Sequence, residues 1–106
     1  MTPDAVDQKL TELVGRKLDA LMVVSTFQRV VAESGDVLQE RQVVSFCGVL
    51  HSHARTEELD SDPAVARLRG AVSVPAGVRG DGLKLETLER TQQAGMWVFE
   101  VRGSAT

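Results

Sequence analysis

The feature that most constrains the fold is a change of hydrophobic pattern near residue 21. Before this point, apolar residues recur at steps of three and four and fall on one stripe of a helix: Val6, Leu10, Leu13, Val14, Leu18 and Leu21. Thr2 suits the N-cap and Pro3 the first turn, so we expect a helix over residues 3–20 with Gly15 inside it. After this point, β-branched and aromatic residues dominate, and such residues favour strands. The sequence therefore predicts one amphipathic helix followed by a β-domain over residues 22–102.

Turn residues divide the second part of the chain into about five short strands. We expect these strands over residues 22–32, 37–51, 68–74, 83–88 and 96–103. Two alternatives stay open: Asp62 and Pro63 could cap a short helix that ends at Gly70, and residues 85–90 would also suit one helical turn. The polar run over residues 52–66 is typical of a long exposed loop. The pattern indicates a mainly β (α+β) fold, a small antiparallel β-barrel or sandwich with the helix docked on it.

Length and composition indicate one soluble domain and exclude several classes of function. A chain of 106 residues with 42% hydrophobic residues builds a single core. The net charge of −3 opposes the positive field of high-affinity nucleic-acid binders, and an aromatic content of 4% leaves few rings to stack on bases. The longest purely apolar run, Ala20 to Val24, is far shorter than the ~20 residues that span a bilayer, so we expect no membrane partner.

The residue types of metal and catalytic sites do not converge in the sequence. His51 and His53 would point to the same side of a strand, a spacing that some zinc sites use, and they are weak candidates for metal ligands. Cys47, the single cysteine, lies about 13 Å from His51 along an extended strand. Its neighbours are typical of a core, which favours an inert buried thiol over a nucleophile. We therefore expect no enzymatic activity, no metal and no cofactor.

Charged and aromatic residues are candidates for contacts with partners. The candidates in the loop are Ser52, Arg55, Glu57, Glu58, Asp60 and Asp62. Arg67 and Arg69 with Arg79 could form a small basic cluster that touches phosphates or pairs with an acidic loop of a neighbouring subunit, although ordinary surface solvation is the favoured explanation. The last strand is apolar on both sides, with Trp97 and Phe99 on one of them. Because one core cannot cover both sides, we expect the chain to form oligomers.

Five segments of the chain, in this order, carry a resemblance to a known family. They are AVDQKLTELVGRKLDAL, QRVVAESGD, VVSFCGVLHS, GAVSVPAGVRGDGLKLE and AGMWVFEVRG, and together they span most of the chain. Their order resembles the small head-completion or stopper proteins of tailed bacteriophages, including the lambda-type head-tail joining proteins.

The resemblance implies a structural protein of the virion neck, assembled in the host cytoplasm and without catalytic activity. Rings of such subunits bind below the portal and adaptor proteins, hold the packaged genome in and dock the tail proteins. The ring would be homo-oligomeric, genomic DNA would pass through it non-specifically, and the loop around residues 52–62 would enter the channel or meet the adjacent ring. Two alternatives remain: a tail terminator or adaptor of the same neck, and a bacterial β-barrel module that binds a peptide or small ligand at His51 and His53.

Overall fold

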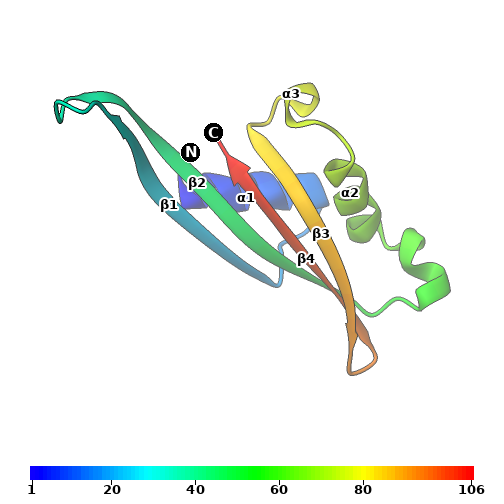
Figure 1. Ribbon diagram of the computed structural model, residues 1–106. Coiled ribbons are helices and arrows are strands. Elements are labelled where there is room, and N and C mark those ends of the chain that lie inside the picture. Colours follow the sequence, from blue (N-terminus) through cyan, green and yellow to red (C-terminus); the bar gives the residue numbers. More distant parts are fainter.

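Helices cover one face of a four-stranded antiparallel sheet (Figure 1). The computed structural model describes the backbone of residues 1–106 and the side chains of residues 1–75 and 78–106. In chain order the elements are α1 (Pro3–Val14), β1 (Ala20–Val31), β2 (Val37–Ser52), the 3-10 helix η1 (Thr56–Ser61), α2 (Pro63–Val72), α3 (Ala76–Arg79), β3 (Leu83–Gln93) and β4 (Met96–Ala105). The strands lie in the order β1-β2-β4-β3.

The N-terminal helix forms as predicted but is shorter than the predicted range of 3–20. The hydroxyl of Thr2 accepts a hydrogen bond from the backbone N–H of Ala5 (3.1 Å), and Pro3 occupies the first turn. Gly15 ends the helix in the left-handed conformation (φ 90°), with its N–H bonded to the carbonyl oxygen of Thr11 (2.8 Å). Because glycine adopts this conformation without a steric penalty, it stops the helix instead of only weakening it. Leu21 then belongs to β1.

The core lies between the sheet and the helices. Alternation places the even-numbered residues of β2 and the odd-numbered residues of β4 on the covered face. The large side chains buried there include Leu50 and Phe99, which pack with Leu10 of α1 and Leu68 of α2. The opposite face of the sheet, here called the open face, has no helix over it (Figure 1).

The prediction of a strand over residues 68–74 is wrong, and the helical alternative is confirmed. Asp62 caps α2 by accepting a hydrogen bond from the N–H of Ala64 (3.1 Å), and Pro63 starts its first turn. The buried residues of this helix recur at helical steps: Ala64, Val65, Leu68 and Ala71. The prediction of a long loop over residues 52–66 is also wrong, because η1 and the first turn of α2 occupy it. Most of residues 53–63 are exposed as predicted, but Leu59 is buried.

The fold class is confirmed, whereas the closed barrel and the fifth strand are not. The structure has four strands, and β1 and β3 form the two edges of an open sheet. Residues 63–72 form a helix over the sheet and so do not supply the fifth strand. Among the described residues, no helix has the length and apolar character needed to cross a bilayer.

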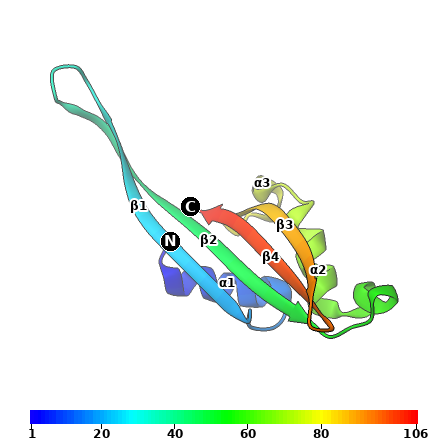
Figure 2. The same cartoon turned by 60° about the horizontal axis from the view of Figure 1, so that its bottom comes forward.

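The hairpin of β1 and β2 extends far beyond the rest of the molecule (Figure 2). Strand β4 pairs with β2 only between Val44 and Ser52, so residues 26–43, here called the arm, form a two-stranded ribbon. The molecule measures 60 × 29 × 22 Å, with a Cα radius of gyration of 16.5 Å. A compact chain of this length has a radius of gyration of about 13 Å. The arm accounts for the elongated shape.

Candidate interaction surface

The arm is a regular ribbon closed by a short turn. At its tip, the N–H of Ala32 bonds to the carbonyl of Asp36 (2.9 Å), and the N–H of Gly35 bonds to the carbonyl of Ala32 (2.8 Å). Gly35 has a φ of 89°, which favours glycine at this position. A register shift between Val30 and Val31 marks a bulge next to the turn. These features follow from the Ser34-Gly35 turn signal in the sequence.

Polar side chains link the two strands of the arm. On one face, Arg29 pairs with Glu40 (3.4 Å between Nη2 and Oε1). On the other, Arg41 donates two hydrogen bonds to the Oε1 atom of Gln28 (2.9 and 3.1 Å). Surface pairs of this kind contribute little stability each, and an isolated two-stranded ribbon is only marginally stable in water.

Large apolar side chains are exposed on the arm and at its base. Among the described side chains, those of this kind on the β1–β2 hairpin are Met22, Val24, Phe27, Val30, Val31, Val37 and Leu38. The exposed fractions of Phe27 and Leu38 both reach 68%. A row of exposed apolar groups on a ribbon with unpaired edges marks an interaction surface or an aggregation hazard. The arm is therefore the strongest candidate for a functional contact.

The open face of the sheet is also partly apolar. Met22 and Val24 of β1 lie there beside Cys47 of β2, and they line a hollow of about 260 Å³. Arg102 of β4 borders this hollow and pairs with Glu100 (2.8 Å). The hydrogen bond and charge of Glu100 raise the pKa of Arg102 above its ordinary value. A fully solvated sheet face is usually polar, so this face resembles a surface meant to be covered.

Three of the polar residues predicted to line an exposed loop, namely Ser52, Asp60 and Asp62, are bonded to the body of the protein. Ser52 is buried, and its hydroxyl donates a hydrogen bond to the carboxylate of Asp62 (2.6 Å). Asp60 pairs with Arg69 (2.7 Å). The backbone carbonyl of Glu58 accepts a hydrogen bond from the hydroxyl of Ser61 (2.6 Å), within η1. The Asp60–Arg69 pair joins η1 to α2, and the Ser52–Asp62 hydrogen bond joins the end of β2 to the start of α2.

Arg55 and Glu57 lie apart from these contacts. Both are exposed, and with His53 and Trp97 they line an open hollow of about 450 Å³ at one end of the sheet. His53, Ala54 and Thr56 of the predicted loop border this hollow as well.

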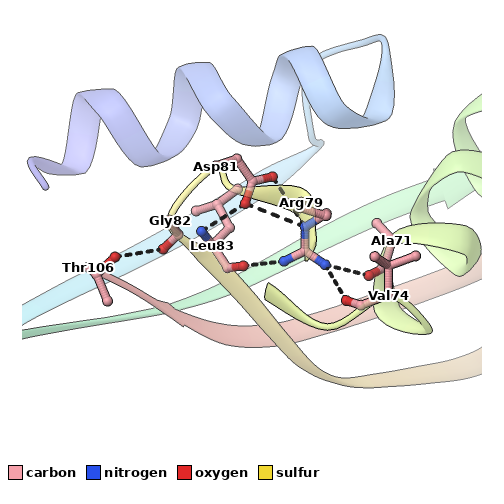
Figure 3. Close-up of polar contacts among 7 residues, drawn as sticks. All are labelled: Ala71, Val74, Arg79, Asp81, Gly82, Leu83 and Thr106. Atoms are coloured by element: carbon pink, nitrogen blue, oxygen red, sulfur yellow. Dashed lines mark hydrogen bonds and ion pairs between the residues drawn. The ribbon is translucent and has the colours of Figure 1, made fainter. Parts of the chain in front are cut away.

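The three arginines of the predicted basic cluster have separate surroundings. Arg79 is almost buried (9% of its side chain exposed) and pairs with Asp81 at 3.2 Å (Figure 3). Its guanidinium also donates to the backbone carbonyls of Ala71, Val74 and Leu83. Arg69 pairs with Asp60 and lies over the ring of Phe99, 5.7 Å from its centroid. Arg67 is exposed on α2. The structure thus brings no basic cluster together from these residues.

The two aromatic residues of β4 that were candidates for an interface differ in exposure. Phe99 is buried in the chain's own core and has no surface for a partner. Trp97 is half-buried at the end of the sheet, where the guanidinium of Arg90 lies 4.8 Å from the ring centroid. Of the two, Trp97 alone can contact a ligand or a neighbour.

The two histidines do not share a site. His51 lies next to Asp19, whose Oδ2 atom accepts a hydrogen bond from the N–H of His51 (2.6 Å) and lies 4.0 Å from its Nδ1 atom. Arg16 donates to the carbonyl of His51 (2.5 Å), so this cluster fixes the connection between α1 and β1. His53 lies beyond the end of β2. Within the described part of the chain, no three His, Cys, Asp or Glu side chains are placed to hold a metal ion.

The candidate residues that the sequence did not single out are those of the arm, above all Phe27 and Leu38. The sequence does contain a signal, because the runs of valines at residues 23–24, 30–31 and 43–44 make both strands apolar on two sides, a pattern that indicates a surface in need of further cover. The sequence did not show that β4 would stop short of these residues and leave them without a third strand.

Comparison of the chain with protein-family models, with curated proteins and with solved structures found no match.

Proposed function

We propose that this chain is a non-catalytic structural subunit that assembles with copies of itself into a ring in the neck of a tailed bacteriophage. In this proposal the ring closes the packaged head and provides the surface on which the tail docks. A tail terminator or an adaptor would use the same kind of ring and differ in the protein it contacts.

The exposed apolar surface of the arm is the observation that carries the proposal. Phe27 and Leu38 are 68% exposed on a ribbon that has no third strand. Burying an aromatic or aliphatic side chain of this size yields roughly 1.5–3 kcal/mol. A subunit that leaves this free energy unused on a projecting element gains it on association, which is the behaviour of an assembly protein rather than of a free-standing enzyme.

The placement in a phage neck rests on the resemblance of the segment order to head-completion proteins. The observed sheet is open, whereas the sequence predicted a barrel, so the family is proposed on segment order and assembly alone. The genes beside this one provide a direct test. Genes for portal, capsid and tail-tube proteins are expected there, and a neighbourhood of metabolic genes would contradict the neck assignment.

Light scattering and negative-stain imaging of the purified chain test the assembly itself. We expect a mass that is a multiple of 11.5 kDa at high protein concentration, and ring-shaped particles. Phe27→Asp places a charge in the proposed contact and should shift the protein towards the monomer, with Kd raised at least about tenfold. Val78→Asp is the matched control, because Val78 is a 75% exposed apolar residue outside the arm. A wild-type chain that stays monomeric at high concentration would rule out the proposal.

A second candidate function is the binding of a small ligand or peptide, and the hollow of about 450 Å³ favours it. This hollow is open, and it presents an imidazole, a guanidinium and an indole ring from His53, Arg55 and Trp97. Because Trp97 is the single tryptophan, its fluorescence reports on this hollow alone. Saturable fluorescence changes with a peptide or metabolite library, lost in His53→Ala, together with a monomeric mass, would favour this function over the ring.

A further inference from the structure

We propose that the arm of one subunit lies on the open face of the sheet of a second copy of this chain. The inference rests on the proposed assembly and deepens it, because it names both surfaces of the contact. The chain exposes more surface than a compact monomer of its mass does.

The excess of exposed surface matches one side of a protein interface. The chain exposes 6728 Å². A compact monomer of 11.5 kDa exposes about 5,800 Å², so the excess is about 900 Å². A standard interface buries about 800 Å² from each partner. The arm therefore supplies the area that one stable contact between two protein chains requires.

The open face is a suitable counterpart for the arm. It carries Met22, Val24 and Cys47 around a hollow of about 260 Å³, with Arg102 and Glu86 at its border. On the arm, Phe27 and Gln42 face each other across the two strands and point to the side of the sheet that the helices cover further along. The helices do not extend over the arm, so this side of it is bare (Figure 2). The arm face with the exposed Phe27, which also carries Gln42 and the Arg29–Glu40 pair, and the partly apolar open face can thus cover each other.

The chain cannot make this contact with itself. Strands β1 and β2 run without interruption from the sheet into the arm as far as the bulge at Val30, close to the tip. The arm therefore projects away from the open face from which it starts and cannot fold back over it. A second copy must supply the other surface.

In a ring this contact is head-to-tail, which means that the subunit receiving an arm passes its own arm to a third copy and does not return it to the donor. Each subunit gives an arm and offers an open face, and these are different parts of its surface. Repetition of such a contact closes a ring when the rotation between neighbours fits. Each subunit in the ring is then both a donor and an acceptor of an arm.

The native thiol of Cys47 allows a direct test, because it lies in the proposed acceptor hollow and is the single cysteine of the chain. The variant Gln42→Cys adds a second thiol on the bare side of the arm, opposite Phe27. After treatment with a short bismaleimide, we expect a ladder of covalent dimers, trimers and larger species on a denaturing gel. The yield of cross-linked species should be about tenfold or more above that of a matched control. In the assembled protein the thiol on the arm of one subunit lies close to Cys47 of the next, and this raises their effective concentration.

The matched control is Glu57→Cys, which places an exposed thiol on η1, outside both surfaces. Circular dichroism and the thermal midpoint show that each variant is folded. Adding Cys47→Ser to Gln42→Cys should reduce the ladder to dimers at most. If the wild-type protein forms rings but Gln42→Cys gives no more cross-linked species than Glu57→Cys does, the proposed arm contact is wrong and the ring assembly is retained. A dimer without larger species would show a two-fold contact and also overturn the proposal. A monomeric wild type would overturn the assembly itself.

Discussion

The side chain of Arg79 links the end of α2 to the start of β3 through three backbone carbonyl groups (Figure 3). Its Nη1 atom donates to the carbonyls of Ala71 (2.6 Å) and Val74 (2.7 Å) at the end of α2. Its Nη2 atom donates to the carbonyl of Leu83, and Asp81 holds the guanidinium in place. The sequence motif Arg79-Gly80-Asp81 thus has a structural role in connecting α2 to β3.

Replacing Arg79 by alanine should lower the free energy of unfolding by about 3 kcal/mol, because the variant leaves Asp81 and several carbonyls without their charged partner. Chemical denaturation followed by circular dichroism measures the change. Arg102→Ala is the matched control, since Arg102 also pairs with an acid two residues away but is exposed, and its midpoint should stay nearly unchanged. Equal losses in the two variants would contradict the role assigned to Arg79.

Gly103 should tolerate no side chain. An added Cβ atom would clash with the carbonyl oxygen of Lys84 and lie 2.7 Å from the ring of Phe46. We expect Gly103→Ala to lower stability by about 2 kcal/mol, since neither the backbone of β3 nor a core ring can move freely. Gly70→Ala provides the comparison: an added Cβ there meets no described atom within 4 Å, and alanine in a helix should gain about 0.5–1 kcal/mol. Thermal unfolding of the two variants should shift in opposite directions.

At the scale of elements, a single carboxylate fixes the start of α2. One oxygen of Asp62 caps the helix through Ala64, and the other accepts the hydrogen bond of the buried Ser52. The same side chain therefore links the end of β2 to the helical layer. Its two contacts explain why the polar segment between them is ordered.

Asp62→Ala should cost about 1–2 kcal/mol, because it removes the cap and leaves the hydroxyl of Ser52 without its acceptor. Asp62→Asn keeps the shape of the side chain and one acceptor oxygen, so its free energy of unfolding should fall much less than that of Asp62→Ala. Denaturant titration of both variants checks the order. A loss in Asp62→Asn as large as that in Asp62→Ala would show that the charge, and not the cap, matters.

The sequence predicted elements well where the local pattern alone decides them. Helix α1 and the β1–β2 hairpin follow from apolar spacing and turn residues, and both were found. The segment over residues 63–72 was assigned wrongly because alternation of Leu68, Val72 and Val74 fits a strand as well as a helix. The N-cap at Asp62 and the packing of this segment against the core decide in favour of the helix. The bare arm could not be predicted, because its exposure depends on where β4 ends.

At the scale of the whole molecule, the projecting arm gives this small protein its elongated shape. A variant in which Asn-Gly joins Thr26 directly to Val43 removes residues 27–42 and keeps the rest of the sheet. We expect this variant to fold, because the core residues lie outside the removed segment, with Leu50, Phe99 and Val101 among them. Its radius of gyration, measured by small-angle X-ray scattering, should fall from near 16.5 Å towards about 13 Å. A variant that fails to fold would show that the arm stabilises the body.

Both ends of the chain meet at one place, beside Gly82 at the start of β3. The backbone N–H of Thr106 donates to the carbonyl of Gly82 (3.0 Å), and the methyl group of Met1 would lie 3.1 Å from a Cβ atom at Gly82. A short peptide can therefore join residue 106 to residue 1. A circularly permuted gene that starts at Gly35 and finishes at Ser34 would then encode the same core with its new ends at the tip of the hairpin, where dyes or affinity tags could be attached by simple fusion.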